Sequence, residues 1–319
     1  MEYRQWFGPV LAMVAVVALA GCIGMRPAAP TVGQLPDRKA TFLVGDAYEA
    51  DGVWYYPAEN YRYDEAGLAA VYPDDPGRGH TTNGEAFDQE AIAAGHATLQ
   101  LPSLVRVTNL DSGLSLVVRV NDRGTAPRGR IIELSRHAAR LLGGTPGVPA
   151  KVRVAILPEE SMAAAAALLA VPSTPTRAGV SPDGAPAPMA APVLVVDVEG
   201  MPPPPASRGR DPFDIASRIP GTLEADGRFL PAPVATQFPT GAGPHEIFVQ
   251  AGAFSIFDVA NRMRARFSTL APARIDPVMV AGTQFFRVRL GPLRNAEHAD
   301  RILAQVLGAE ANGARIVVD

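Results

Sequence analysis

Apolar and polar residues alternate in several short stretches of this chain. The clearest stretch covers residues 114–120, where every second side chain is apolar: Leu114, Leu116, Val118 and Val120. Ser115 and Arg119 lie between them, and a period of two is typical of a strand with one face buried and one face solvated. The same pattern recurs over residues 152–156 and is shorter around Val105–Val107. We predict a strand at each of these places.

One helix is predicted among these strands. Ser135 is a suitable N-cap, the apolar positions Ala138, Leu141 and Leu142 follow at helical spacing, and Gly143-Gly144 ends the pattern. Many short strands with little helix favour a small β-barrel. We therefore expect residues 41–157 to form one mainly β domain.

The last segment, residues 246–319, contains an internal repeat. Val249–Gly252 aligns with Val288–Gly291, and each copy runs from a strand into a helical pattern. The helical stripes comprise Val259, Met263 and Phe267 in the first copy, and Ala299, Ile302, Leu303 and Val306 in the second. With further strands at Val278–Val280 and Arg315–Val318, the order is β-α-β-β-α-β, a small ferredoxin-like α+β domain.

Residues 158–245 differ from both flanking regions in composition. They hold 17 of the 31 prolines, long alanine-rich stretches and three aromatic residues. Such a segment buries too little apolar surface to offset its ordering entropy. We predict a disordered Pro/Ala-rich linker with an r.m.s. span of about 50 Å.

The first residues are typical of a targeting segment. Arg4 precedes an apolar run, Val10–Ala20, that is too short to span a membrane as a helix. The run ends in Leu19–Cys22, which resembles a bacterial lipobox, and Cys22 is the only cysteine. We predict a signal peptide over residues 1–21, a lipidated tether over 22–40, and, since Ile23 follows the cysteine, sorting to the outer membrane. The alternative is an ordinary secretory signal with an incidental cysteine.

Composition excludes some function classes. A formal net charge of -3 is unlike the basic surface of a nucleic-acid-binding protein. The histidines at 80, 137, 245 and 298 have no metal-ligand spacing with other ligands. We therefore predict no metal, no cofactor and no nucleic-acid partner.

Three motifs in residues 41–157 could carry chemistry. They are Gly79–Asp88 (GHTTNGEAFD), Ala94–His96 and Val120–Gly124 (VNDRG), and Val107–Leu110 and Arg130–Ser135 accompany them. With these motifs, Val44–Leu157 resembles the double-psi β-barrel domain of the rare lipoprotein A family. The resemblance implies a lytic transglycosylase that acts on peptidoglycan strands free of stem peptides and leaves 1,6-anhydromuramyl ends. It places the acid/base residues at Glu85, His96 and Asp122.

Reasoning from the residues alone is compatible with this role for Asp122. The residue follows a strongly apolar strand, so its carboxyl group should be partly desolvated at a barrel rim, where it can keep a proton for donation. Asn-Asp-Arg-Gly is also a good turn sequence, Glu85 could be solvated, and His96 could pair with a helix terminus. We further expect Tyr72, Asn83 and Arg123 to contact the substrate.

One segment departs from the family pattern. Where the family has Ala-Ser-Trp-Tyr-Gly, this chain has Ala69–Pro73 (AAVYP), followed by Asp74 and Asp75 in a longer connection. Val71 cannot replace a tryptophan as a sugar-stacking platform. Substrate binding could be weakened, shifted to Tyr72, or lost.

The C-terminal repeat resembles a sporulation-related repeat domain, which implies binding to denuded glycan strands. The resemblance covers residues 246–319 and centres on Val249–Phe254 (VQAGAF). Strand alternation groups the candidate binding residues on one sheet face: Phe248, Gln250, Phe285, Arg287 and Arg289. The alternative is an ordinary solvated sheet face.

Three functions therefore remain open. The first is a lipid-anchored, septum-enriched glycan-cleaving enzyme of the outer membrane, facing the periplasm. The second is a non-catalytic peptidoglycan-binding outer-membrane lipoprotein with a degenerate barrel, which Val71 and Pro73 favour. The third is a structural lipoprotein that recruits division partners through its linker. The sequence identifies no protein partner.

Overall fold

The structure is a computed structural model that describes most of the chain beyond residue 38. The described residues are 39–50, 53–75, 77–124, 128–145, 147–170, 218–239, 244–280, 282–309, 311 and 313–319. The predicted signal peptide, the lipobox with Cys22 and most of the predicted linker lie outside them. Within the described part, no helix is long and apolar enough to cross a membrane.

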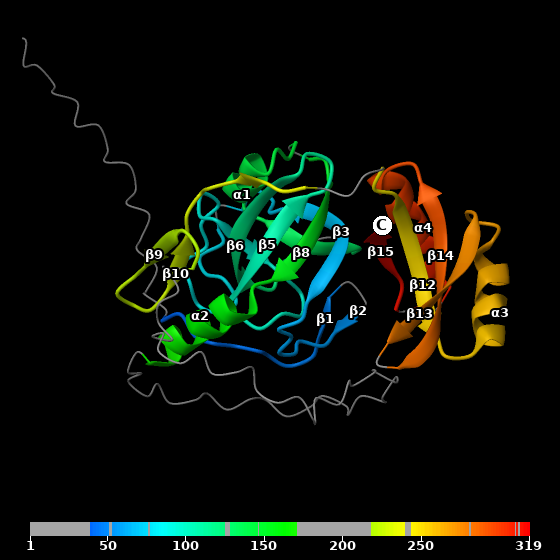
Figure 1. Cartoon of the computed structure of the whole chain (residues 1–319), viewed down its shortest axis with the longest axis horizontal. Coiled ribbons are helices and arrows are strands. Elements are labelled where there is room, and N and C mark those ends of the chain that lie inside the picture. The colour runs from blue at the N-terminus through cyan, green and yellow to red at the C-terminus, as the bar shows by residue number, and fades with distance from the viewer. Residues whose placement is uncertain are drawn as a thin grey trace, which may run out of the picture. The chain divides into compact units, whose positions relative to one another are not determined.

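Six strands close into a barrel (Figure 1). They are β3 (Asp64–Val71), β4 (Ala93–Gly95), β5 (Ser103–Asn109), β6 (Leu114–Asp122), β7 (Arg130–Leu134) and β8 (Ala150–Ile156). The order around the barrel is β6-β4-β7-β3-β8-β5, and β5 pairs back onto β6. The pairs β3–β7 and β4–β6 are parallel and the other pairs are antiparallel. The predicted double-psi β-barrel is confirmed.

The barrel core consists of the alternating apolar residues that the sequence pattern singled out. It includes Val105, Val107, Leu116, Val118, Val120, Val152 and Val154, all essentially inaccessible to solvent. Helix α1 (Arg136–Leu141) begins where predicted, since the Ser135 hydroxyl accepts a 3.1 Å hydrogen bond from the amide of Ala138. A short hairpin of β1 (Tyr48–Ala50) and β2 (Val53–Tyr55) precedes the barrel.

Two parts of the predicted linker are folded. The first is α2 (Pro158–Ala170), which starts with proline at its first position and carries Glu159 and Glu160 in its first turn. Its alanines are strong helix formers, and several of them are buried. The Ser161 hydroxyl accepts a 2.9 Å hydrogen bond from the amide of Leu104 and so fixes the helix to β5.

The second folded part, residues 218–239, is called the strap below. Its strands β9 (Gly221–Leu223) and β10 (Phe229–Pro231) form a hairpin, and β11 (Thr236–Gln237) adds antiparallel to β6. Phe229 has no exposed surface and packs with Leu104, Ala163, Ala164 and Ile219. Gly221 faces the Phe229 ring so closely that a side chain there would collide with it.

The strap overturns one expectation about β6. The alternation predicted a half-buried strand with Arg119 on the solvated face, but the Arg119 side chain is 1% exposed. The Phe229 carbonyl accepts a 3.2 Å hydrogen bond from its guanidinium. The prediction was wrong because a segment 110 residues downstream covers the outer face of the strand.

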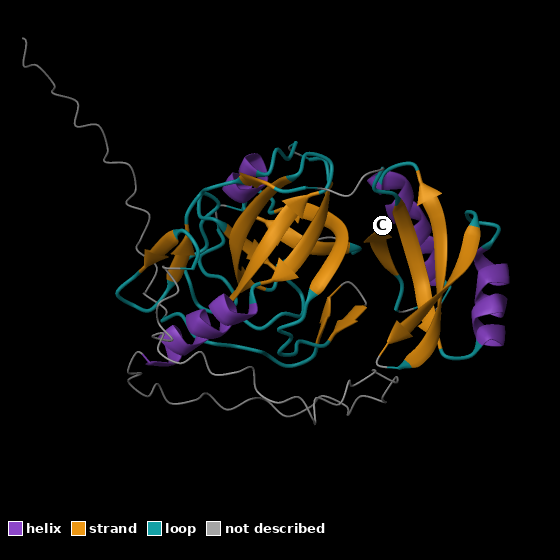
Figure 2. Cartoon of the chain, viewed as in Figure 1, coloured by secondary structure: helices purple, strands orange, loops and turns teal. Residues whose placement is uncertain are grey.

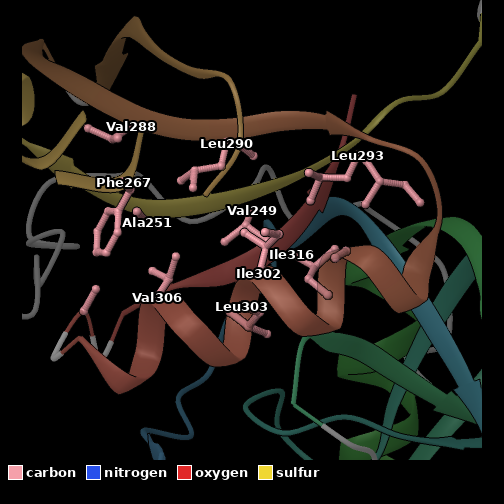
Figure 3. Packing of buried hydrophobic residues seen from close by; sticks show 14 of the residues in the cluster. Val249, Ala251, Phe267, Val288, Leu290, Leu293, Ile302, Leu303, Val306 and Ile316 are labelled. Carbon is pink, nitrogen blue, oxygen red and sulfur yellow. The ribbon is translucent and has the colours of Figure 1, made fainter. Parts of the chain in front are cut away.

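The C-terminal domain has the predicted order of elements, and Figure 2 shows its helices in purple and its sheet in orange. They are β12 (Ile247–Phe254), α3 (Phe257–Phe267), β13 (Ala273–Val280), β14 (Thr283–Leu293), α4 (Ala296–Gly308) and β15 (Arg315–Val318). The antiparallel sheet runs β13-β14-β12-β15, so the two copies of the repeat pair side by side. Figure 3 shows the core, in which Val249, Leu290 and Ile316 of the sheet pack against Ile302, Leu303 and Val306 of α4.

Candidate active site

Asp122 lies at the end of β6, in a ring of hydrogen-bond donors. Its Oδ1 accepts from the Thr82 amide at 2.9 Å, the Thr82 hydroxyl at 2.6 Å and the Arg123 amide at 2.9 Å. Its Oδ2 accepts from the Tyr72 hydroxyl at 2.9 Å. The carboxyl group is 2% exposed, yet Thr82 is an exposed residue. Asp122 is therefore buried by a single layer of side chains.

Arg78 completes this ring from the connection that follows β3. Its guanidinium forms an ion pair with Oδ2 of Asp122. It also lies 4.9 Å from the Tyr72 ring centre and 4.6 Å from the Phe87 ring centre. Sequence reasoning missed this residue, because the connection was noted for its acidic residues. The available signal was a lone arginine there, one residue before the Gly79–Asp88 motif.

Tyr72 supports Asp122 and presents no open face to a sugar. Its hydroxyl points at Asp122, and its ring is buried between Phe87 and the Arg78 guanidinium. Burial raises the pKa of this phenol, and the charges of Asp122 and Glu133 raise it further. The hydroxyl therefore stays protonated and donates. Gly95 makes the close approach possible, since any side chain there would collide with the Tyr72 hydroxyl.

Glu85 forms a separate, sealed ion pair with Arg119. Arg119 Nη2 donates to Oε1 at 2.7 Å, and Asn121 and Asn83 donate to the same carboxylate at 2.9 and 2.8 Å. Burial opposes ionisation of Glu85, but the charge of Arg119 and these hydrogen bonds outweigh it and lower the pKa. Glu85 is thus held as a carboxylate that accepts protein hydrogen bonds.

This sealed pair fastens the turn that carries Thr82. Asn83 is buried and donates to Glu85, while its own amide donates to the Asn121 carbonyl at 3.3 Å. The Thr81 hydroxyl donates to Asn83 Oδ1 at 2.9 Å. Residues 81–85 are therefore tied to β6, and Thr82 is placed against Asp122. Asn83 therefore acts on the site by holding this turn in place, and its own side chain is buried.

Within the described part of the chain, no hydrogen bond joins the His96 ring to Asp122 or Glu85. Its Nδ1 accepts from the amides of Thr98 and Leu99 at 3.2 and 3.1 Å, which assigns the proton to Nε2. Burial, with a smaller contribution from Arg123, lowers the pKa of His96 to about 3. The ring is therefore neutral at neutral pH. The His96 backbone amide donates a 2.9 Å hydrogen bond to the Asp122 carbonyl.

A cavity of about 280 Å³ adjoins the Asp122 site through Arg123. Its lining includes Tyr48, Tyr55 and Glu133, and the two tyrosine rings stack with their centres 5.3 Å apart. The Arg123 guanidinium donates to the carbonyls of Val44, His96 and Leu99. Stacked rings beside polar groups suit a sugar, which has apolar faces and polar edges. Sequence reasoning missed this pair, although the aromatic run Trp54–Tyr56 was a signal.

The candidate residues of the C-terminal domain share one sheet face but are largely buried. Gln250 and Arg289 are register partners on β12 and β14. Arg289 forms an ion pair with Asp319, and the guanidinium of Arg274 lies 4.2 Å from the Phe248 ring centre. Phe248, Gln250, Phe285 and Arg289 are buried and Arg287 is partly exposed. This face therefore has ion-paired arginines beside buried aromatic rings.

Two family models match the two folded regions of the chain. A lytic transglycolase model with a double-psi β-barrel matches residues 64–154, and a SPOR domain model matches residues 244–318. The crystal structure of the RlpA SPOR domain from Pseudomonas aeruginosa is also similar. It is 30% identical, covers 22% of this chain and 96% of that chain, and has a TM-score of 0.22.

Similarity to curated proteins extends over most of the chain. The endolytic peptidoglycan transglycosylase RlpA of Pseudomonas aeruginosa is 35% identical over 261 residues, which are 80% of this chain and 71% of that protein. The protein of the same name from Escherichia coli K12 is 47% identical over 93 residues, 29% of this chain and 26% of that protein. The chain therefore belongs to the RlpA family of endolytic peptidoglycan transglycosylases.

Proposed function

We propose that this protein is an endolytic peptidoglycan transglycosylase that cleaves glycan strands lacking stem peptides. The observation that carries the proposal is Asp122, a carboxyl group buried under one layer of side chains at the barrel rim. Curated proteins of the same family are named endolytic peptidoglycan transglycosylases.

Asp122 acts as general acid and then as general base. In its protonated form it gives the proton to the glycosidic oxygen while the bond from that oxygen to C1 of the muramoyl sugar breaks. The resulting carboxylate then takes the proton of the sugar's 6-hydroxyl while the 6-oxygen bonds to C1. No water is consumed, the product is a 1,6-anhydro end, and Asp122 is protonated again. A hydrolase would instead need two carboxyl groups flanking the bond.

The neighbouring residues position Asp122. Thr82 and Tyr72 each place a hydroxyl on one of its oxygens, which fixes the direction of its free lone pairs. Glu85 supports Thr82 through the turn over residues 81–85. His96 supports the 96–99 segment, whose carbonyls hold Arg123. Glu85 and His96 are thus positioning residues in this proposal, and Asp122 is the catalytic one.

Sugar binding in this proposal uses the cavity beside Arg123. Val71 packs against the barrel core and offers no ring, and the Tyr72 ring is covered. Tyr48 and Tyr55 supply the aromatic surface that the family's tryptophan would otherwise provide. Because the cavity also contains polar groups of Arg123 and Glu133, it can bind a sugar by its face and its edge.

Digestion of sacculi tests the activity. Purified protein is incubated with sacculi whose stem peptides have been removed, and the released fragments are analysed by mass spectrometry. We expect 1,6-anhydromuramyl ends. Reducing ends would identify a hydrolase, and intact strands that nevertheless bind the protein would support the non-catalytic alternative that Val71 and Pro73 favour.

The C-terminal domain is the glycan-binding module in this proposal. Its family match supports attachment to peptidoglycan, and Arg287 is the partly exposed member of the candidate set. We expect that deletion of residues 246–319 abolishes enrichment at the division septum but leaves envelope association intact. Equal septal fluorescence of the full chain and the truncated chain would contradict this role.

The proposed location is the periplasmic face of the outer membrane. It rests on the sequence Leu19–Cys22, with the thiol of Cys22 carrying the lipid. Mass spectrometry of the mature protein should find acyl groups on an N-terminal Cys22, and Cys22→Ser should abolish them. A mature terminus at any other residue would exclude the anchor.

A further inference from the structure

Arg78 is held ready to bind an anion at the Asp122 site. Its guanidinium lies against the rings of both Tyr72 and Phe87, at 4.9 and 4.6 Å from their centres. The turn before it is fixed as well, since the Arg78 amide donates to the Asp75 carbonyl at 3.2 Å. A cation stacked on two rings loses little conformational freedom when it binds a ligand.

Most of the hydrogen-bonding capacity of Arg78 is unused. A guanidinium has five N–H donors. Within the described part of the chain, the one hydrogen bond of this guanidinium is to Oδ2 of Asp122. The side chain is 16% exposed, against 2% for Asp122, so the remaining donors can be reached from solvent.

Asp122, in contrast, does not need Arg78 to stay in place. Its two oxygens accept four further hydrogen bonds, from Tyr72, from the amide and hydroxyl of Thr82, and from the Arg123 amide. The Arg78 guanidinium also occupies the Oδ2 position that a transferred proton would need. The contact therefore suits a resting state, and catalysis requires Arg78 to leave Oδ2.

The proposed substrate carries an anionic group that can replace Asp122 as the partner of Arg78. Each muramoyl sugar carries a lactyl group whose carboxyl carbon is joined to the stem peptide by an amide. Hydrolysis of that amide leaves a lactyl carboxylate, the anionic group of a denuded strand. A carboxylate accepts two parallel N–H bonds from a guanidinium, whereas an amide carbonyl offers a single neutral oxygen.

We infer that Arg78 recognises the lactyl carboxylate of a denuded muramoyl sugar and that this contact releases Asp122 for catalysis. The inference rests on the proposed function and adds to it a specificity-determining residue. The guanidinium moves from Oδ2 to the substrate carboxylate. Asp122 keeps its four other donors and loses its cationic partner, which frees a position on Oδ2 for the proton that the reaction transfers. A strand that keeps its stem peptides cannot make this exchange.

Two matched substrates test the inference. Peptide-free strands are used with the lactyl carboxylate intact, or with the same group converted to a methylamide by carbodiimide coupling. The full-length wild-type protein, Arg78→Gln and Arg78→Lys are compared. Arg136→Gln is the control, because Arg136 pairs with Asp74 of the same connection and makes no contact with Asp122. Anhydro ends are counted to give kcat and KM separately, and binding of both strands is measured by calorimetry.

We expect the wild type to prefer the carboxylate strand by at least about tenfold in kcat/KM, since the methylamide removes the charged hydrogen bonds to Arg78. Arg78→Gln should lose this preference, Arg78→Lys should keep part of it, and Arg136→Gln should match the wild type. A preference that survives in Arg78→Gln, or is absent from the wild type, overturns the inference. If no strand is cleaved, the proposed function fails, and equal calorimetric affinities of the wild type for both strands would still reject the role of Arg78.

Discussion

Two carboxylate–arginine pairs with a buried carboxylate, both in the described part of the barrel, differ in accessibility. In the Glu85–Arg119 pair the side chains are 3% and 1% exposed, and both residues belong to the hydrogen-bonded body of the barrel. In the Asp122–Arg78 pair the carboxylate is 2% exposed, but the arginine is 16% exposed and comes from a surface connection. One pair is closed on all sides, and the other has a partner that can move away.

This difference distinguishes a pair that stabilises the barrel from a carboxyl group that is available for reaction. The sealed pair keeps its charge because Arg119, Asn121 and Asn83 stabilise the carboxylate, so Glu85 cannot readily take up a proton. The other carboxylate has mostly neutral donors and one removable cation. Burial alone would not distinguish the two groups. The solvent exposure of the arginine in each pair distinguishes them.

Asp122→Asn should produce the largest effect. The substitution keeps the size of the side chain but cannot cycle a proton, so we expect kcat for anhydro-end formation to fall by about 10²–10⁴-fold. Thermal unfolding should show that the variant remains folded, since an amide oxygen can still accept hydrogen bonds from Thr82 and Arg123. A variant that retains more than a tenth of wild-type kcat would remove Asp122 from the catalytic role.

Arg119→Met should act on stability. It leaves the Glu85 charge buried without its cation, which costs about 3–5 kcal/mol in the free energy of unfolding. Arg78→Gln, at the accessible pair, should cost only about 1 kcal/mol because four donors remain on Asp122. Urea unfolding of both variants measures the contrast. Equal losses would mean that the two pairs do not differ as described.

Phe229→Ala tests whether the strap supports the sealed pair. Removing a fully buried phenylalanine costs about 3–5 kcal/mol when the surroundings do not collapse. The strap should then become sensitive to protease and the barrel less stable. Phe238→Ala is the matched control within the strap, because that ring is exposed and lies against Arg106, 4.9 Å from its guanidinium. Similar protease sensitivity in both variants would argue against a specific role for Phe229.

His96 should make the barrel acid-sensitive. Its folded pKa of about 3 lies below the ordinary value of 6.5, so the unfolded chain binds the additional proton between these values. The free energy of unfolding should therefore fall as pH drops below 6.5, by up to about 1.4 kcal/mol per pH unit, with no further loss from His96 below pH 3. Urea unfolding from pH 7 to 5 should show a smaller slope for His96→Gln. Parallel curves would show that His96 does not set the slope.

Val71→Trp should have the smallest effect. Val71 borders a cavity of about 380 Å³ with Ala70, Pro73 and Glu133, which leaves room for a larger ring. If the missing aromatic limits sugar binding, KM should fall by a few fold while kcat still depends on Asp122. An unchanged KM would indicate that Tyr48 and Tyr55 already provide the aromatic surface.

The sequence predicted the fold better than it predicted the contacts of the site. Alternation identifies β5, β6 and β8 because barrel interiors select apolar residues at every second position, and the repeat identifies β12 and β14. The sequence motifs Gly79–Asp88 and Val120–Gly124 contain Thr82, Glu85 and Asp122, so they identify the region of the site. No local pattern shows that Phe229 covers Arg119, because that contact joins residues 110 positions apart.

The Arg78 contact was unpredictable for a different reason. It depends on how the connection after β3 turns back over Asp122, which Asp75 and Gly77 fix through a 3.0 Å hydrogen bond. The exposure of Tyr72 could not be predicted for the same reason. The sequence does not show whether a tyrosine ring is open to solvent or covered, as here, by an arginine side chain. Individual residue types thus indicate what a site could do, and loop geometry decides what they contact.

The docked strap also determines how far the two modules can separate. With β11 paired to β6, the barrel is joined to the C-terminal sheet by the chain from Gln237 to Ile247, which spans at most about 35 Å when fully extended. If the strap detached from β6, the last fixed point before the C-terminal sheet would be α2, which ends at Ala170, 77 residues before Ile247. A short connection raises the effective concentration of the barrel at positions on a glycan strand next to a bound C-terminal domain. Pairing of β11 with β6 therefore limits how far the barrel and the C-terminal sheet can separate.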